Sequence, residues 1–196
     1  MVKKQIQILL FLLLFLNGYA QKKKTVYINA DSIIITKKEY KAANNNLFSK
    51  EKVTTDSLIT NRLKSKRAYG FIIAEYKKLL FSILDKLSNE TTDRNSKIFI
   101  HNFSNLKKPL KKAEKNKCYW DYLNANQKKY TSFLITSLPS LKTKKNRTFY
   151  DEKKIIQQLF FSFSDYEINH VIIKPNGEFT IYYGDYNMCY ILDSET

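Results

Sequence analysis

Glycine, proline, cysteine and histidine are all scarce in this chain of 196 residues, and the small number of glycines excludes one class of site. The four glycines are Gly18, Gly70, Gly177 and Gly184, and their spacing forms no glycine-rich loop that could cradle phosphate groups. That excludes the common nucleotide-binding and dinucleotide-binding enzymes. No Gly-x-Ser-x-Gly segment is present to expose a nucleophilic serine. The sequence therefore contains no recognisable catalytic motif, and we favour a protein that is not an enzyme.

His101 and His170 are the two histidines of the chain. Neither has a second metal-ligating residue at a recognisable spacing, and zinc takes three or four ligands. A metal site built from both histidines and a Cys or Asp is one interpretation. Packed or surface histidines are the other, and we favour it, so no metal and no cofactor is expected.

Two cysteines, Cys118 and Cys189, form no Cys-x-x-Cys motif. One intramolecular disulfide, two buried free thiols or pairing between chains all stay open at this point. Cys118 is a weak candidate for a catalytic thiol, since Lys115 and Lys117 favour its thiolate form and His101 could serve as a base. Packing of Cys118 in a helix is the plainer interpretation.

The first twenty residues have the pattern of a secretory signal peptide. Lys3 and Lys4 supply a positive start, an apolar run extends from Ile6 to Leu16, and Gly18 and Ala20 precede the expected cleavage point. A membrane-spanning helix needs about 20 apolar residues, and this run is roughly half as long. We therefore expect residues 1–20 to be removed and the protein to be exported, periplasmic or secreted, with no transmembrane segment in the mature chain.

Basic residues greatly outnumber acidic ones, and the formal net charge is +16. Residues 147–196 carry four basic and eight acidic residues, so the excess lies earlier in the chain. Such an excess favours an anionic surface, a polysaccharide or a protein partner, whereas export argues against nucleic acid. Codon usage in an AT-rich genome also enriches lysine, so many of these side chains can be ordinary surface. The candidate polyanion-binding residues are Lys107, Lys108, Lys111, Lys112, Lys115, Lys117, Lys142, Lys144, Lys145 and Arg147.

Hydrophobic periodicity predicts alternating strands and helices. The Thr36–Glu39 spacing is that of a capping box, so a short helix should follow it, and residues 46–64 fit either a strand or a helix. Apolar residues at helical spacing predict a core-facing helix over 66–88, including Tyr69, Ile72, Ile73 and Tyr76. Further strands are expected at 25–29, 33–35, 97–101 and 133–136, further helices at about 110–124 and 150–161, a basic loop at 138–148, and a hairpin of 170–174 with 178–183.

This order predicts a mixed α/β fold. We expect a single domain with one central mixed sheet, flanking helices and a short N-terminal strand-helix extension. The divisions are a signal peptide at 1–20, the extension with its amphipathic helix at 21–96, and an α/β region at 97–196.

The α/β region resembles a thioredoxin-like domain. Lys97 to Phe103 is similar to the strand that leads into the redox motif of that family, and His170 to Gly184 looks like its last two strands. Ser104-Asn105-Leu106-Lys107 stands where the family has Cys-x-x-Cys, and Ile168-Asn169-His170 stands where it has a proline. The resemblance therefore implies the fold without the dithiol chemistry. The mature N-terminus, with Val26 to Asn29 and Thr36 to Glu39, also resembles that of small exported bacterial proteins, which implies no activity.

Three function classes follow. The leading one is a non-catalytic exported protein that binds a partner or surface through its basic half. The second is a divergent thioredoxin-like or thiol-dependent enzyme that uses Cys118. The third is a periplasmic inhibitor or immunity-type partner.

Overall fold

The computed structural model describes residues 23–141 and 147–195, and its chain divides into two compact units at Ser65 and Lys66. Each unit has its own sheet, so the expectation of one central sheet is wrong, while the expected mixture of α and β elements is confirmed. The residues of the predicted signal peptide lie outside the described ranges. The sequence predicts a division after residue 96, whereas residues 66–96 lie in the second unit.

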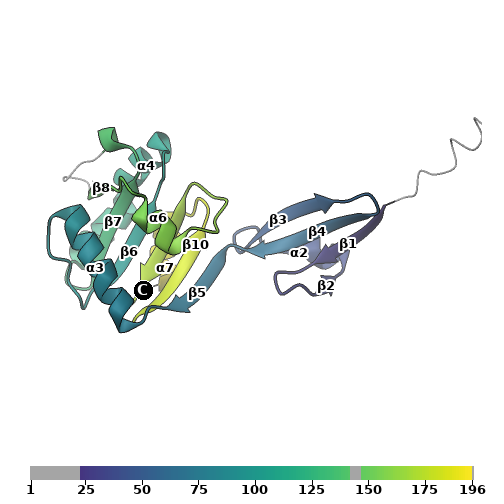
Figure 1. The fold of residues 1–196 in the computed structure, drawn as a ribbon, viewed down its shortest axis with the longest axis horizontal. Helices are drawn as coiled ribbons and strands as arrows, with labels where there is room; N and C mark the ends of the chain where they lie inside the picture. The colour runs from purple at the N-terminus through teal and green to yellow at the C-terminus, as the bar shows by residue number, and fades with distance from the viewer. Residues whose placement is uncertain (1–22, 142–146, 196) are drawn as a thin grey trace, which may run out of the picture. The chain divides into compact units, whose positions relative to one another are not determined.

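Within residues 23–65, the first unit is a four-stranded sheet with one short helix (Figure 1). Its strand order is β2-β1-β4-β3, with β1 parallel to β4 and the other pairs antiparallel. Thr36 caps the helix by the predicted capping box with Glu39. Residues 46–64, left open between strand and helix, form most of the β3–β4 hairpin. The elements are β1 Lys24–Ile28, β2 Ile34–Ile35, α2 Lys37–Ala42, β3 Phe48–Thr54 and β4 Leu58–Ser65.

The second unit has a six-stranded sheet of order β5-β10-β9-β6-β7-β8. Strands β6, β7 and β8 are parallel, and β9, β10 and β5 follow in antiparallel pairs. The strands are β5 Arg67–Phe71, β6 Lys97–Asn102, β7 Tyr130–Thr136, β8 Thr148–Tyr150, β9 Asn169–Ile173 and β10 Glu178–Tyr183. The helices are α3 Ala74–Ser88, α4 Lys107–Glu114, α5 Lys117–Ala125, α6 Ile155–Phe160 and α7 Met188–Glu195, with a 3₁₀ turn η1 at Pro139–Leu141.

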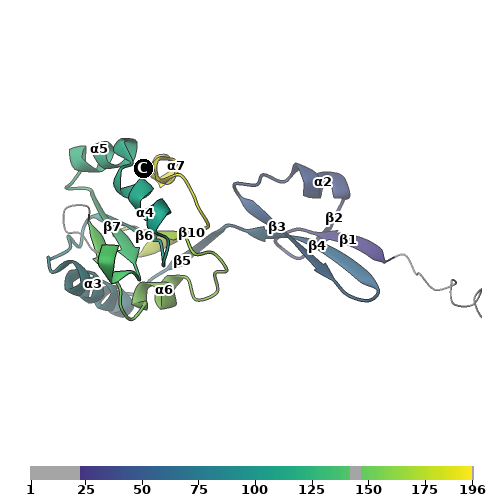
Figure 2. The ribbon, with the colours of Figure 1, turned by 90° about the horizontal axis from the view of Figure 1, so that it is seen from above.

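Helices cover both faces of this sheet, with α4, α5 and α7 on one side and α3 and α6 on the other (Figure 2). Successive strand residues point to opposite faces, so Ile98 and Ile100 of β6 join the core under α3 and α6, while Phe99 joins the core under α4, α5 and α7. Burial on both faces explains why β6, β7 and β9 are nearly continuous apolar runs. The same alternation places His101 and His170 on the α4, α5 and α7 side.

The predicted helix over 66–88 is wrong in its first third. Residues Arg67–Phe71 instead pair with β10 as strand β5, and Arg67 stacks over the Tyr182 ring at 4.8 Å. Tyr69, Ile73 and Tyr76, expected in the core, are 71%, 50% and 66% exposed. Backbone pairing with a distant strand decided this segment, and sequence periodicity does not register such pairing.

Two other helices are shorter than predicted. The segment at 110–124 is two helices, α4 and α5, because Asn116 interrupts it and accepts a hydrogen bond from the Tyr119 N–H as the cap of α5. The segment at 150–161 begins as β8, and α6 starts only at Ile155, where the buried Asp151 carboxylate accepts from the N–H of Ile156. Leu159 of α6, although apolar, is exposed.

The predicted C-terminal hairpin is confirmed as β9 and β10. The Gly177 N–H donates to the Lys174 carbonyl, and Gly177 alone of the turn residues has positive φ, at 98°. Helix α7, which we did not predict, follows the hairpin and packs beside α5.

Candidate functional site

The two histidines of the chain face each other inside the second unit. His101 of β6 and His170 of β9 are directly opposed in the antiparallel register of these strands. Their exposed fractions are 0% and 1%, and their Nδ1 atoms lie 2.7 Å apart. A hydrogen bond at this distance requires one ring to donate and the other to accept. Both histidines are therefore packed inside the second unit and not exposed at its surface.

The hydrogen bonds continue away from His170 through two more buried side chains. His101 Nε2 lies 2.6 Å from the hydroxyl of Tyr119 on α5, and that hydroxyl lies 2.8 Å from Ser132 Oγ on β7. Ser132, Tyr119, His101 and His170 thus form one chain of polar groups across the core, which we call the buried relay. In addition to β9, the strands β6 and β7 and the helix α5 each contribute one residue to it.

Burial keeps both rings of the relay neutral near pH 7. Loss of hydration lowers the pKa of His170 to about 3, partly offset by an interaction with the Gly184 backbone. The pKa of His101 is also well below its ordinary value, first because of burial and then because of the neighbouring His170. Burial raises the pKa of the Tyr119 hydroxyl, so that group keeps its proton.

Because both rings are neutral, the hydrogen bonds of the relay can run from donor to acceptor in either of two directions. In one, Tyr119 donates to His101 Nε2, His101 Nδ1–H donates to His170 Nδ1, and His170 carries its proton on Nε2. In the other, every donor and acceptor is reversed, and His170 Nε2 has a lone pair. The relay therefore lets Nε2 of His170 act either as a donor or as an acceptor without placing charge in the core.

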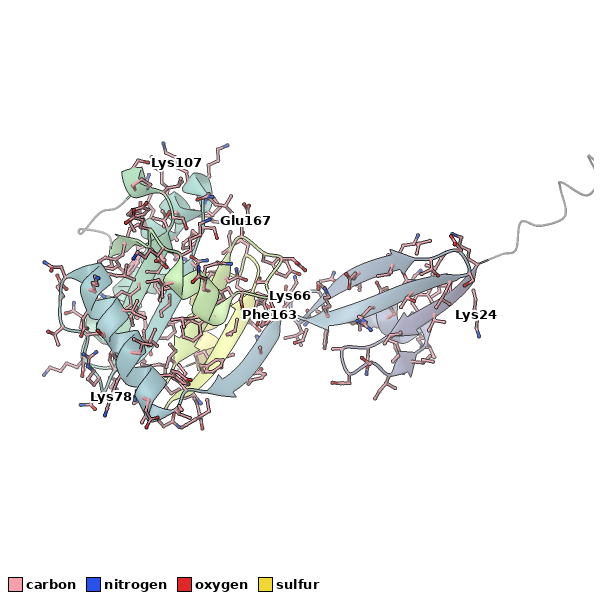
Figure 3. All side chains as sticks on the ribbon, in the orientation of Figure 1. Lys24, Lys66, Lys78, Lys107, Phe163 and Glu167 are labelled. Carbon is pink, nitrogen blue, oxygen red and sulfur yellow. A yellow bond between two sulfur atoms is a disulfide. The ribbon has the colours of Figure 1, made fainter. Side chains whose placement is uncertain are left out.

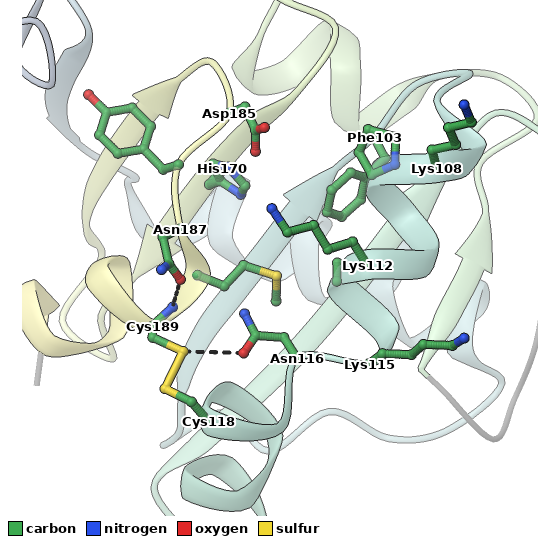
Figure 4. A pocket seen from close by; sticks show the side chains of 14 residues that line it. Phe103, Lys108, Lys112, Lys115, Asn116, Cys118, His170, Asp185, Asn187 and Cys189 are labelled. Carbon is green, nitrogen blue, oxygen red and sulfur yellow. Dashed lines mark hydrogen bonds between the residues drawn. A yellow bond between two sulfur atoms is a disulfide. The ribbon is translucent and has the colours of Figure 1, made fainter.

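Nε2 of His170 is buried and forms no hydrogen bond of regular geometry within the part of the chain that the structure describes, although the Gly184 backbone interacts with the ring. His170 also lines a pocket of about 1000 Å³ between α4 and the segment from β10 into α7 (Figure 4). Unpaired polar atoms in protein interiors are rare and cost free energy. The other lining residues are Phe103, Lys108, Pro109, Lys112, Ala113, Lys115, Asn116, Cys118, Asp185, Tyr186, Asn187, Met188 and Cys189.

The charges of this pocket are predominantly positive. Lys108, Lys112 and Lys115 line it together with one carboxylate, that of Asp185. In Figure 4 the Lys112 side chain points in the direction of His170, whereas the ends of the Lys108 and Lys115 side chains are directed away from it. All three lysines are exposed, so solvent and ligands have access to their ammonium groups.

The predicted polyanion-binding residues separate into three groups. Lys107, Lys111 and Lys117 are exposed but do not line the pocket, and Lys107 extends from the surface in Figure 3. Lys142, Lys144 and Lys145 lie outside the described residues. Arg147 is half-buried, with its guanidinium 5.9 Å from the centre of the Trp120 ring. Lys108, Lys112 and Lys115 are thus the ones that the fold brings to the pocket.

Cys118 and Cys189 form a disulfide between α5 and α7, and both line the pocket. Their Cα atoms are 6.3 Å apart, within the usual range for such a bond. This resolves the alternatives that the sequence left open, and it means that Cys118 carries no free thiolate in this structure. Cys118 is exposed and Cys189 is half-buried.

Among residues 23–141 and 147–195, no group of three or more His, Cys, Asp or Glu side chains is arranged to hold a metal ion. The two histidines use their Nδ1 atoms on each other, and the two cysteines are bonded together.

Sequence reasoning missed how these residues meet. Both histidines lie in short apolar strands of the kind that are buried on both faces of a sheet. That apolar context was the signal in the sequence that could have predicted their burial. Tyr119, Ser132 and Asp185 carried no signal of their own, because their roles depend on the packing of α5 and of the segment after β10.

No helix within the described ranges is both long enough and apolar enough to cross a membrane. Comparison of the chain with protein-family models, curated proteins and solved structures finds no match, so a functional proposal rests on the geometry of the site.

Proposed function

We propose that this protein is an exported, non-catalytic binding protein that recognises an anionic partner through the lysines of α4 and the start of α5. The observation that carries this proposal is the basic surface formed by Lys107, Lys108, Lys111, Lys112, Lys115 and Lys117. All six side chains are exposed, and none forms an ion pair within the described part of the chain. Unneutralised cations at this density create a positive potential that attracts anions.

The packing of α4 explains how the lysines come to lie on one accessible surface. Leu110 and Ala113 are buried against the sheet, so the remaining positions of the helix are turned toward solvent. Glu114, the one acid between residues 107 and 117, is engaged by the Thr148 hydroxyl. Its carboxylate accepts that hydrogen bond at 2.8 Å and does not pair with a lysine of the basic surface.

Export is part of the proposal, and two observations support it. The first twenty residues have the order of a signal peptide, and disulfides such as Cys118–Cys189 persist mainly in oxidising compartments outside the cytoplasm. A thioredoxin-like relationship is also proposed. The order β6, α4–α5, β7, β8, α6, β9–β10 contains the strand, helix, strand, helix, hairpin order on which the resemblance rests, with one additional strand, β8, before α6.

Replacing Lys107, Lys111 and Lys117 together with glutamine tests the binding proposal. Because each lysine that contacts a polyanion releases about one counterion, the slope of log Kd for heparin against log salt concentration should fall by about 2. The matched control is K37Q/K38Q/K52Q in the first unit, which removes the same charge from exposed positions. Equal salt slopes for both triple variants, or wild-type binding that does not weaken with salt, would contradict the proposal.

The position of the disulfide favours thiol–disulfide exchange as a second candidate function. Once an external dithiol has reduced Cys118 and Cys189, the Cys118 thiolate would attack a partner's disulfide, breaking that bond and forming a mixed disulfide. Cys189 would then displace the partner as a dithiol, so that the partner gains two electrons and the Cys118–Cys189 bond reforms. Lys115 and Lys117 stand near Cys118 in the chain and favour the thiolate.

This second candidate predicts a reactive Cys118. In the C189S variant, which leaves Cys118 unpaired, a thiol reagent should modify Cys118 faster than it modifies free cysteine at neutral pH. The C118S variant, with Cys189 unpaired, is the control and should react more slowly. Modification of Cys118 no faster than free cysteine would remove this function.

A further inference from the structure

The buried Nε2 of His170 marks a ligand site. It is a polar atom on a 1% exposed residue that lines a pocket of about 1000 Å³, and it forms no hydrogen bond of regular geometry in the described part of the chain, although the Gly184 backbone interacts with the same ring. The opposite end of the same ring is held by His101. The ring is thus fixed in place while Nε2, a buried atom beside the pocket, is left without a regular hydrogen bond, as expected of a group that completes its hydrogen bonding with a bound molecule.

We propose that this pocket binds a small molecule carrying a carboxylate or phosphate group, which accepts a hydrogen bond from Nε2 of His170 and is neutralised by Lys108, Lys112 and Lys115. The inference rests on the proposed function in so far as it names a ligand class for part of the same basic surface. It goes beyond that function because it assigns a discrete small-molecule site rather than general attraction to polyanions.

The charges of the lining select an anion. Three lysines stand against one carboxylate, so a cationic ligand would meet net repulsion and an oxyanion would meet net attraction. Charge-assisted hydrogen bonds from lysine to carboxylate or phosphate are also stronger than neutral ones. Asp185, Asn116 and Asn187 add acceptors and amides that suit hydroxyl groups on the rest of the ligand.

The buried relay can donate a hydrogen bond to an oxyanion while its own side chains stay neutral. With a proton on Nε2 of His170, its Nδ1 accepts from His101, and His101 Nε2 in turn accepts from the Tyr119 hydroxyl. Ser132 then donates to Tyr119. Each group in the relay donates to the next, ending on the ligand oxygen, and every ring stays neutral. In the reverse direction a lone pair would face the anion, so an oxyanion selects the first direction.

The experiment exploits the fact that the chain has two histidines. The full mature protein, labelled with ¹⁵N at histidine, is titrated at neutral pH with inorganic phosphate, with glucuronate and with uncharged glucose. We expect saturable changes of the His170 ring nitrogens with phosphate or glucuronate in the millimolar range or below, and none with glucose. In the bound state Nε2 should carry the proton and Nδ1 should not. The anion that binds more tightly identifies the preferred oxyanion.

Two lysine variants of equal charge separate the pocket from the surrounding surface. K108Q/K112Q/K115Q removes the cations that line the pocket and should weaken anion binding by about tenfold or more. K107Q/K111Q/K117Q removes three neighbouring cations outside it and should change binding by only about twofold. All six positions are exposed, so neither variant should disturb the fold.

The inference is overturned if neither anion moves the His170 nitrogens, if Nε2 is unprotonated in the bound state, or if the two triple variants bind equally well. Its failure is distinguishable from failure of polyanion binding. Heparin binding with an unresponsive His170 would overturn the pocket site alone, whereas a responsive His170 without heparin binding would overturn the polyanion proposal alone.

Discussion

Replacing both Cys118 and Cys189 with serine should lower the free energy of unfolding by about 4 kcal/mol. The disulfide closes a loop with a sequence separation of 71, and a cross-link over so long a loop removes much conformational entropy from the unfolded chain. It also ties α7, the C-terminal helix, to α5. Denaturant unfolding of the oxidised wild type and of C118S/C189S measures the difference directly.

Two controls accompany this prediction. Reduced wild-type protein should lose about the same stability as C118S/C189S, because both lack the cross-link while their side chains differ by only one atom. A titration of thiols in the unfolded, unreduced protein should find none, since both sulfurs are bonded. A loss below about 1 kcal/mol, or free thiols in that titration, would show that the disulfide does not stabilise this unit.

Lowering the pH from about 6.5 toward 3 should destabilise the second unit, by about 1.4 kcal/mol per pH unit through His170 and further through His101. Both histidines have folded-state pKa values below the ordinary value of 6.5, His170 at about 3, chiefly because burial disfavours the charged form. The unfolded chain therefore binds more protons over this range. The stabilising effect is complete above about pH 6.5 and is lost as the pH falls through the folded-state pKa values.

Variants that cannot titrate isolate this contribution from that of the carboxylates. Glutamine can donate and accept hydrogen bonds but carries no titratable proton, so H101Q and H170Q should each unfold with a shallower acid dependence than the wild type. For H170Q the difference in slope should be about 1.4 kcal/mol per pH unit between pH 4 and 6, and for H101Q it should have the same sign. Chemical unfolding measured across this range checks it. Identical slopes for the variants and the wild type would mean that the histidines are not held neutral.

Local interactions made several elements predictable from the sequence. The Thr36–Glu39 capping box forms within three residues, and it starts α2 as expected. The turn at Gly177 likewise depends on the positive φ of one residue, and it joins β9 to β10 as expected. Strands β6 and β7 were recognisable because burial on both faces requires a run of apolar residues.

Segments whose structure depends on a distant partner were not predictable in this way. Residues 67–71 have apolar spacing that also fits a helix, and only their pairing with β10 makes them a strand. The chain breaks at Asn116 into two helices, and this break places Tyr119 of the second helix against the sheet, beside His101. Helix α7 was missed because its sequence has no strong periodic pattern, and it is held by packing and by the disulfide to α5.

By itself, the sequence determined the mixture of strands and helices, the excess of positive charge between residues 107 and 117, and the absence of common catalytic motifs. The tertiary structure alone decided that two histidines separated by 69 positions share a hydrogen bond, that two cysteines are bonded, and that three of the lysines line one pocket. The physical reason is that charge, capping and apolar periodicity act between near neighbours. Strand register and helix packing, by contrast, bring together side chains that are remote in the chain, and they leave no local trace in it.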